Sequence, residues 1–289
     1  MRRTGAQPSR PHNHPMRFDL VTIFPEFFSS ILSHGVLRRA IASGRVEVGV
    51  HDLRAFTHDR HRTVDDRPFG GGEGMVLKPE PLAEALESLG VPAKAVQDHD
   101  TRRVQAILLS AQGQRFTQAT ARELAGLERV VLLCGRYEGV DERVNQLFCD
   151  RELSVGDYVL SGGELAAAIV LDATARLLPG VLGNEASSEY ESFGRADAGM
   201  EADTGGAPPR STHGAGGLLD YPHYTRPPEF RGLAAPAVLA GGDHAAIRRW
   251  RRARALEKTL RNRPDLLPAA DLSEEDRRYL RSLGWTAER

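Results

Sequence analysis

The sequence predicts an α/β fold in its first two thirds, with a parallel β-sheet covered by helices on both faces, followed by a helical region. Short, almost wholly apolar strand candidates recur along the chain, and segments with a helical pattern lie between them. Strands that are buried on both faces form continuous apolar runs, which is typical of parallel sheets. A composition change near residue 195 and a basic helical pattern near the C-terminus predict the second part.

The first part is expected to start at Met16, because residues 1–15 are polar, lack periodicity and predict a disordered tail. Pro25 should begin a helix after the first strand. Backbone N–H groups in the first helical turn have no partner within the helix, so the N–H that proline lacks costs nothing there. The expected strands are Phe18–Phe24, Val46–Val50, Val104–Leu109 and Val130–Cys134, and the expected helices between them are Pro81–Leu89 and Thr117–Leu127.

The second part begins after a predicted core helix at Glu164–Leu178, which Pro179 and Gly180 end. Residues 195–217 contain six glycines, five alanines and two prolines, which predicts a flexible linker. The expected domains are therefore residues 16–187, a linker at 188–217 and a small all-α domain at 218–289.

Two helices are predicted in the C-terminal domain. Asp243 can cap the first, and Ser273 precedes a second that carries acids in its first turn. The apolar stripe expected on the first helix consists of Ile247, Trp250, Ala253, Leu256 and Leu260.

The composition indicates a cytoplasmic protein. Cys134 and Cys149 are the two cysteines, too few for a disulfide framework, and no secretory signal pattern is present at the N-terminus. The longest strongly apolar stretch, Leu165–Leu171, is too short to span a membrane.

The charge is distributed unevenly along the chain. Its formal net charge is −1, but residues 244–263 contain eight Lys or Arg residues and one acid, so the remainder carries −8. A concentrated basic segment favours a polyanionic partner bound at one place. A solvated helix face is the alternative explanation for such a segment.

Three glycine-bearing segments are candidates for a binding pocket: Ser110–Gln114, Gly135–Gly139 and Ser154–Glu164. Each is expected to follow a strand, and ligands of open α/β sheets bind at the carboxyl ends of strands. Plain turns are the alternative. The sequence lacks the motifs of ordinary dinucleotide, nucleoside triphosphate, zinc and serine hydrolase sites.

Five motifs in one order resemble the TrmD family of bacterial tRNA (guanine-37-N1)-methyltransferases. The resemblance runs from Met16 to the C-terminus, with alanine at position 111 where the family usually has proline and with a longer segment at 195–217. The motifs are His58–Gly72, Cys134–Gly139, Gly156–Glu164, Leu218–Pro227 and His244–Trp250.

The resemblance implies a trefoil-knotted α/β domain of the SPOUT class and a homodimer with active sites at the subunit interface. It implies methyl transfer from S-adenosylmethionine to N1 of guanine 37 in tRNA. A 2′-O-ribose RNA methyltransferase of the same fold and a non-catalytic RNA-binding protein are the alternatives.

The catalytic roles also come from the resemblance. It assigns Asp220 as the general base that removes the N1 proton and Arg176 as the group that stabilises charge on O6. From the sequence alone, Asp220 is better explained as a turn residue before Pro222, and Arg176 as an ion-pair partner of Asp172 on one helix face.

The same resemblance supplies the remaining site residues. It implies Mg²⁺ dependence, for which Glu138 is the candidate carboxylate, while the metal ligands stay unknown. The expected cofactor-binding residues are Leu109, Ser110, Gly135, Tyr137, Glu138, Val155, Gly156, Asp157, Tyr158, Val159, Leu160, Gly162 and Gly163. The expected RNA-binding residues are Arg60, Arg67, Arg226, Arg248, Arg249 and Arg251.

Residues 58–72 allow three interpretations. Two histidines and three aspartates close together in the sequence suggest a metal site, although their spacing does not by itself bring them around one ion. In the related family this stretch borders the guanine pocket, where Gly70–Gly72 would admit a flat base. A cluster of structural salt bridges is the third interpretation.

Overall fold

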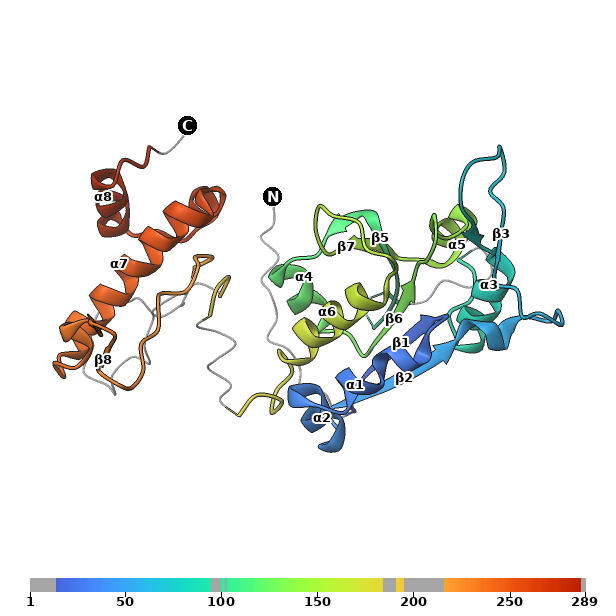
Figure 1. The fold of residues 1–289 in the computed structure, drawn as a ribbon, viewed down its shortest axis with the longest axis horizontal. Helices are drawn as coiled ribbons and strands as arrows, with labels where there is room; N and C mark the ends of the chain where they lie inside the picture. The colour runs from blue at the N-terminus through green and yellow to red at the C-terminus, as the bar shows by residue number, and fades with distance from the viewer. Residues whose placement is uncertain (1–13, 95–99, 102, 184–190, 195–215, 287–289) are drawn as a thin grey trace. The chain divides into compact units, whose positions relative to one another are not determined.

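The computed structural model divides into two compact units, Met1–Gly183 and Asn184–Arg289 (Figure 1). It describes residues 14–94, 100–101, 103–183, 191–194 and 216–286. Most of the predicted N-terminal tail and residues 195–215 of the predicted linker lie outside the described residues.

The first unit is built on a five-stranded sheet with the order β2-β1-β6-β5-β7, in which all neighbouring strands are parallel. This confirms the predicted parallel α/β architecture. The strands are β1 (Met16–Thr22), β2 (Val46–Asp52), β5 (Val104–Arg115), β6 (Arg129–Cys134) and β7 (Arg151–Ser154). A separate two-stranded antiparallel sheet pairs β3 (Asp65–Asp66) with β4 (Val76–Leu77).

Helices cover both faces of the five-stranded sheet, as Figure 1 shows. Phe18 and Leu20 of β1 face a core shared with α2, α4 and α6, whereas Val21 faces a second core shared with α3 and α5. Successive strand side chains point to opposite faces, so the three central strands β1, β6 and β5 supply both cores. The helices of this unit are η1 (Pro25–Phe28), α1 (Ser29–Leu32), α2 (Gly35–Ala42), η2 (Leu53–Phe56), α3 (Pro79–Ser88), α4 (Gln118–Leu124), α5 (Glu142–Phe148) and α6 (Glu164–Ala175).

Several boundaries differ from the sequence-based expectation. The first strand ends at Thr22 rather than Phe24, and Pro25 opens a 3₁₀ helix. β5 continues to Arg115, six residues past the predicted end, because its last residues pair again with β7. β7 and α5 were not predicted: both are short and rich in polar residues, so neither carries a clear apolar period.

The second unit contains two main helices, α7 (His244–Asn262) and α8 (Glu274–Ser282), which begin where the capping residues predicted. The Asp243 side chain accepts hydrogen bonds from two backbone N–H groups, and Ser273 forms a capping box with Asp276. The unit also holds η4 (Ala237–Leu239) and η5 (Pro264–Ala269). Its core consists of Leu218, Leu256, Leu267, Leu272 and Leu280.

Two expectations for this unit need correction. An antiparallel pair, β8 (Glu229–Phe230) and β9 (Leu233–Ala234), lies before α7, so the unit is not entirely helical. The buried residues of α7 are Ala255, Leu256 and Thr259, whereas Ala253 is only half-buried. The apolar stripe is therefore turned toward Ala255 relative to the predicted one.

None of the helices among the described residues combines the length and the apolar character needed to cross a membrane.

Candidate active site

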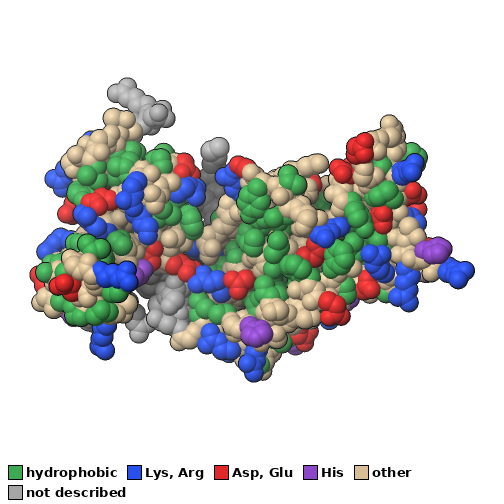
Figure 2. Space-filling model, viewed as in Figure 1, with side chains coloured by type: hydrophobic (Ala, Val, Ile, Leu, Met, Phe, Trp, Pro, Cys, Tyr) green, Lys and Arg blue, Asp and Glu red, His purple; other side chains and the backbone are tan. Residues whose placement is uncertain are grey.

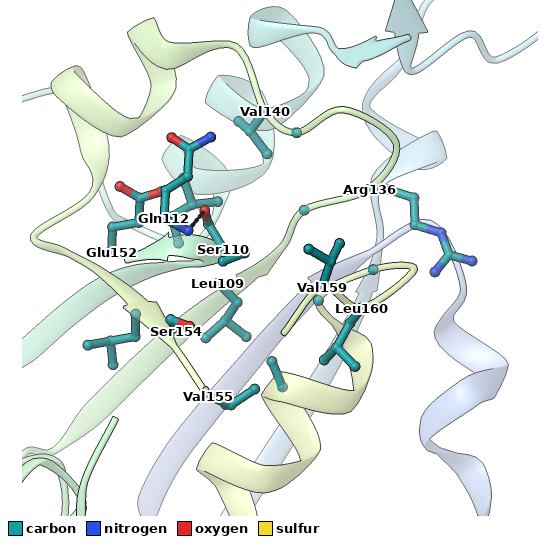
Figure 3. Close-up of a pocket in the computed structure, with 18 of the residues that line it drawn as sticks. Leu109, Ser110, Gln112, Arg136, Val140, Glu152, Ser154, Val155, Val159 and Leu160 are labelled. Carbon is teal, nitrogen blue, oxygen red and sulfur yellow. Dashed lines mark hydrogen bonds between the residues drawn. The ribbon is translucent and has the colours of Figure 1, made fainter. Parts of the chain in front are cut away.

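A pocket of about 380 Å³ lies at the carboxyl ends of β6, β5 and β7, three neighbouring strands of the sheet. Residues from all three predicted segments line it, so the expectation that these segments converge is confirmed. Figure 3 shows Leu109, Val155 and Leu160 around one part of the pocket and Ser110 and Gln112 around another. The volume lies in the range of small-molecule sites.

The first segment is an excursion within β5 that only glycine permits. Leu109 and Gln114 both pair with Leu153 of β7, so residues 110–113 leave the regular ladder. A Cβ atom on Gly113 would lie 2.5 Å from the carbonyl carbon of Glu152 and 2.5 Å from the nitrogen of Leu153. The backbones of β5 and β7 can approach this closely because glycine has no side chain.

The excursion presents polar groups to the pocket. The backbone N–H of Gln112 donates a hydrogen bond to Oγ of Ser110 at 3.0 Å, drawn as a dashed line in Figure 3. Ala111, which stands where the related family usually has proline, lines the same wall. The tight turn is therefore held by a side-chain hydrogen bond and by the contact of Gly113 with β7.

The second and third segments are tied directly to each other. The Gly163 N–H donates to the Gly135 carbonyl at 2.8 Å, and Arg136 forms an isolated antiparallel bridge with Gly162. A Cβ atom on Gly163 would lie 2.6 Å from Cα of Cys134. The first turn of α6 therefore packs against the end of β6 with no room for a side chain.

Arg136 lines the pocket, and sequence analysis assigned it no role. Its Nη1 lies 3.5 Å from Oε2 of Glu164, which is 3% exposed, and its guanidinium lies 4.7 Å from the ring centre of Phe24. Thr22 donates to the other carboxylate oxygen of Glu164 at 2.8 Å. This network joins β1, the segment that follows β6 and the start of α6, and through Arg136 it reaches the pocket wall.

The structure places eleven of the thirteen expected cofactor residues in the pocket wall. These are Leu109, Ser110, Gly135, Tyr137, Glu138, Val155, Tyr158, Val159, Leu160, Gly162 and Gly163. Gly156 and Asp157 do not line it. Asp157 forms an exposed ion pair with Arg115, and Gly156 makes room for the Tyr158 ring, which would clash with a Cβ atom at this position.

Sequence analysis missed other residues of the wall. Glu142 and Glu152 come from α5 and β7, the two elements that were not predicted, and Asn145 donates to Glu152 at 3.3 Å. Ser154 was quoted in the third segment without a role, although it directly precedes Val155. Val140 directly follows the second segment, and this position beside a motif is the sequence signal that could have placed it in the wall.

Neither cysteine is suited to nucleophilic chemistry. Burial raises the pKa of the Cys134 thiol well above its ordinary value, and the charge of Glu164 raises it further. Burial likewise raises the pKa of Cys149 to about 12. Both thiols are therefore protonated near neutral pH.

Asp220 lies in the second unit on a segment attached to the core of that unit. Leu218 is fully buried, and the backbone N–H of Leu219 donates to Oγ1 of Thr259 in α7 at 3.0 Å. The N–H of Asp220 donates to Oγ of Ser192, also at 3.0 Å. Gly217, at the end of the predicted linker, is hydrogen-bonded through its N–H to the carbonyl of Gly194. The described parts of the linker thus belong to the second unit.

The carboxylate of Asp220 has two hydrogen-bond partners. Oδ1 accepts from the backbone N–H of Tyr221 at 2.8 Å, and Oδ2 lies 2.9 Å from Nε2 of His223. The first contact is local and fits the interpretation of Asp220 as a turn residue. The second was not anticipated from the sequence.

Arg176 lies at the C-terminal cap of α6 in the first unit. It is half-buried, and its backbone N–H donates to the carbonyl of Asp172 at 3.2 Å.

The expected RNA-binding residues of the first unit are exposed. Arg60 and Arg67 lie on the segment between η2 and β4, which also carries Phe69 with 97% of its surface exposed. The described residues hold no group of three or more His, Cys, Asp or Glu side chains arranged for a metal ion. Residues 58–72 are described throughout, so the metal-site interpretation of this segment finds no support.

The basic residues of α7 fall into two groups. Arg252 forms a 2.8 Å ion pair with the buried Asp276, and Arg254 pairs with Glu257, so these two are structural. Arg251 packs over the Tyr221 ring at 4.9 Å. The remaining expected RNA contacts of this unit, Arg226, Arg248 and Arg249, are exposed or half-buried. Figure 2 shows Lys and Arg side chains, in blue, on the visible face of the second unit.

Comparison with known proteins decides the family. The profile of the tRNA (guanine-1)-methyltransferase family TrmD matches residues 16–269. The chain belongs to the TrmD family. A protein of Koribacter versatilis named tRNA (guanine-N(1)-)-methyltransferase is 59% identical over 268 residues, which cover 93% of this chain and 98% of that protein. Proteins of the same name from Geobacter sulfurreducens and Geobacter metallireducens are 48% and 47% identical over the same shares of both chains.

Membership in the TrmD family confirms the resemblance drawn from the five motifs and makes the chain an enzyme of the tRNA (guanine-N1)-methyltransferase type. It favours methylation of a base over both alternatives considered from the sequence. The profile covers the pocket of the first unit and the Asp220 segment of the second, so both belong to the family's shared region.

Proposed function

We propose that this TrmD enzyme transfers a methyl group from S-adenosylmethionine to N1 of guanine 37 in the anticodon loop of tRNA. The observation that carries this proposal is the pocket at the carboxyl ends of β5, β6 and β7, lined by the family's glycine-bearing motifs. We place the reaction in the cytoplasm, where tRNA is modified in bacteria.

The pocket suits a cofactor of the size and chemistry of S-adenosylmethionine. Leu109, Val155 and Leu160 supply apolar contact for an adenine ring, and Gly135 and Gly163 expose the backbone at the junction of the second and third segments. Tyr158, with 53% of its surface exposed, lies at the opening. When bound, S-adenosylmethionine supplies an electrophilic methyl group on a sulfonium centre.

The residues of this chain then have to make guanine N1 nucleophilic. N1 carries a proton near neutral pH, and a carboxylate within hydrogen-bond reach can remove it. Asp220 is the proposed base, supported by its position in the Leu218–Pro227 motif and by its partly exposed carboxylate. Negative charge moves to O6 as the proton leaves, and the guanidinium of Arg176 is proposed to stabilise it.

A homodimer is proposed, with the active site completed across the subunit interface. The first unit exposes large apolar side chains at η1 and on the outer face of α6: Phe24, Phe27, Leu165 and Ile169 are each 43–49% exposed. These two elements contact each other, so the four side chains belong to one region. Exposed apolar clusters of this kind mark association surfaces. The trefoil knot is part of the same proposal.

The described residues contain no group of three or more His, Cys, Asp or Glu side chains arranged for a metal ion. Glu138 lines the pocket and is exposed, and it stays the candidate carboxylate for Mg²⁺. No step of the proposed reaction is assigned to a metal ion.

The second unit is proposed to bind the tRNA backbone. Arg248 and Arg249 at the start of α7 and Arg226 are the proposed contacts of that unit, joined by Arg60 and Arg67 of the first unit. Arginine guanidinium groups bind phosphates, and such contacts carry strong salt dependence.

The test combines methyl transfer with binding. Unmodified tRNA transcripts are incubated with the enzyme and donor labelled in its methyl group, and the labelled nucleotide is mapped. We expect label on the base of guanine 37 and calorimetric binding of S-adenosylmethionine. Label on a ribose 2′-oxygen or at another nucleotide, or no binding of the donor, would contradict the proposal.

A further inference from the structure

We infer that His223 is a positioning residue that holds the carboxylate of Asp220 in its reactive orientation. The inference deepens the proposed function and rests on Asp220 being the general base. It starts from the 2.9 Å contact between Nε2 of His223 and Oδ2 of Asp220.

The direction of this hydrogen bond follows from the chemistry of its partners. An ionised carboxylate can only accept hydrogen bonds, so Nε2 of His223 carries the proton and donates it. Tyr221 donates its backbone N–H to the other oxygen, Oδ1, at 2.8 Å. Each carboxylate oxygen then has one donor and keeps one lone pair, and rotation of the carboxylate about its Cβ–Cγ bond is restricted.

The imidazole of His223 is itself held in place. Its ring centre lies 4.5 Å from that of Tyr221 at an interplanar angle of 44°, and the guanidinium of Arg251 lies 4.9 Å from the Tyr221 ring centre. Tyr221 is half-buried, and burial raises the pKa of its phenol, with Arg251 opposing the shift and Asp220 adding to it. Asp220, Tyr221, His223 and Arg251 thus form one electrostatic cluster.

The backbone on which the pair stands is fixed as well. Leu218 is buried in the core of the second unit, and Leu219 and Asp220 donate backbone hydrogen bonds to Thr259 and Ser192. The side chain of His223 is 66% exposed and that of Asp220 is 23% exposed. A base held rigidly at a partly open position can meet a substrate base without reorganising during the reaction.

The distinction between a positioning role and a structural role can be tested by a double-mutant cycle. Single-turnover methyl transfer is measured at saturating donor and tRNA for wild type, His223→Ala, Asp220→Asn and the double variant. His223→Ala should lower the rate about 10- to 100-fold, the size expected for losing one hydrogen bond to a charged group. It should leave the dissociation constants of donor and tRNA unchanged.

The rate of the double variant decides between the two roles. If His223 acts through Asp220, adding His223→Ala to Asp220→Asn causes no further loss of rate, whereas independent effects would multiply. His223→Gln, whose amide nitrogen can take the place of the imidazole Nε2 as donor, should recover part of the rate. Glu275→Ala, which removes an exposed side chain on α8 of the same unit and lies outside the proposed site, is the control and should behave as wild type.

The outcomes separate the inference from the proposed function. A wild-type rate for His223→Ala, or no recovery in a folded His223→Gln, overturns the inference while Asp220→Asn still tests the base. Weaker tRNA binding with an unchanged saturated rate would place His223 against RNA and also overturn it. A near-normal rate for Asp220→Asn would refute the proposed base itself, whatever the His223 variants show.

Discussion

Asp19 shows how a single buried charge is accommodated in the sheet that carries the pocket. Its side chain is fully buried on β1 and accepts hydrogen bonds from Arg17 at 2.9 Å, Arg129 at 2.7 Å and His51 at 2.7 Å. A Cβ atom on the neighbouring Gly49 would lie 2.6 Å from its Oδ1, so glycine makes room for the carboxylate. Burial alone would raise the pKa of Asp19, but the hydrogen bonds from Arg17 and His51 and the charge of Arg129 outweigh it and lower the pKa.

Asp19→Asn should therefore destabilise the folded enzyme. Losing the carboxylate removes charge-assisted hydrogen bonds to Arg17 and Arg129, which are partly exposed, and this typically lowers the free energy of unfolding by about 1.5–3 kcal/mol. Because the folded-state pKa of Asp19 lies below that of the unfolded chain, its contribution is complete above about pH 4 and is lost as the pH falls further. Urea denaturation of both proteins from about pH 7 to pH 3 measures the difference. A gap that stays constant across this range would contradict the account.

Roles of single residues could be predicted from the sequence where a residue's type and its position in its own segment determine what it contacts. Asp243 and Ser273 are helix caps as predicted, because the capping side chain acts within its own segment. Arg136 and His223 were not assigned roles, because their partners Glu164 and Asp220 become significant only through side-chain geometry. Gly156 was assigned to the pocket from its motif; it does not line the pocket wall, and its lack of a side chain leaves room for the Tyr158 ring.

At the level of elements, the junction of β5 and β7 decides the shape of the pocket. The excursion at residues 110–113 was expected to be a loop after the strand, yet the strand resumes and pairs again with Leu153. No local pattern shows this, because the pairing depends on β7, a four-residue strand that begins with Arg151 and Glu152. The apolar strand β6 was placed closely by its sequence, because its burial on both faces is visible as an apolar run.

Gly113→Ala should disturb this junction. Its added methyl group would lie 2.5 Å from the backbone of β7, so the two strands must separate, at a typical loss of about 1–3 kcal/mol in the free energy of unfolding. The affinity for S-adenosylmethionine should fall as well, because Ser110 and Gln112 move with the excursion. Thermal unfolding and calorimetry measure both effects.

The control is Gly183→Ala, which makes the same chemical change where no other atom lies within 4 Å of the new methyl group. It should preserve stability and donor affinity. Equal behaviour of the two variants would show that the close contact at Gly113 does not shape the pocket.

At the scale of the whole molecule, charge is divided between a basic segment and an acidic remainder. Residues 244–263 carry +7 against a net charge of −1 for the chain. The structure shows that part of this charge is used internally, since Arg252 and Arg254 are paired within the second unit. Sequence analysis located the basic segment but could not separate structural arginines from those available to RNA.

Reversing Arg248 and Arg249 together to glutamate should weaken tRNA binding and reduce its salt dependence by about one unit of slope for each phosphate that the variant no longer neutralises. The affinity for S-adenosylmethionine should not change. Binding titrations at several salt concentrations measure this. Reversing Arg278 and Arg281 together to glutamate, two exposed positions on α8, controls for the change in net charge. If the double variant binds tRNA like wild type, the RNA-binding surface lies elsewhere.

The most direct measurement of the central claim is the single-turnover rate of methyl transfer by Asp220→Asn at saturating tRNA and donor. An amide cannot accept the N1 proton, so we predict a loss of about 10²- to 10⁴-fold, the usual size of a general-base contribution. The dissociation constant of S-adenosylmethionine should match that of wild type. A variant that keeps close to the full rate would show that another group removes the proton and would contradict the account.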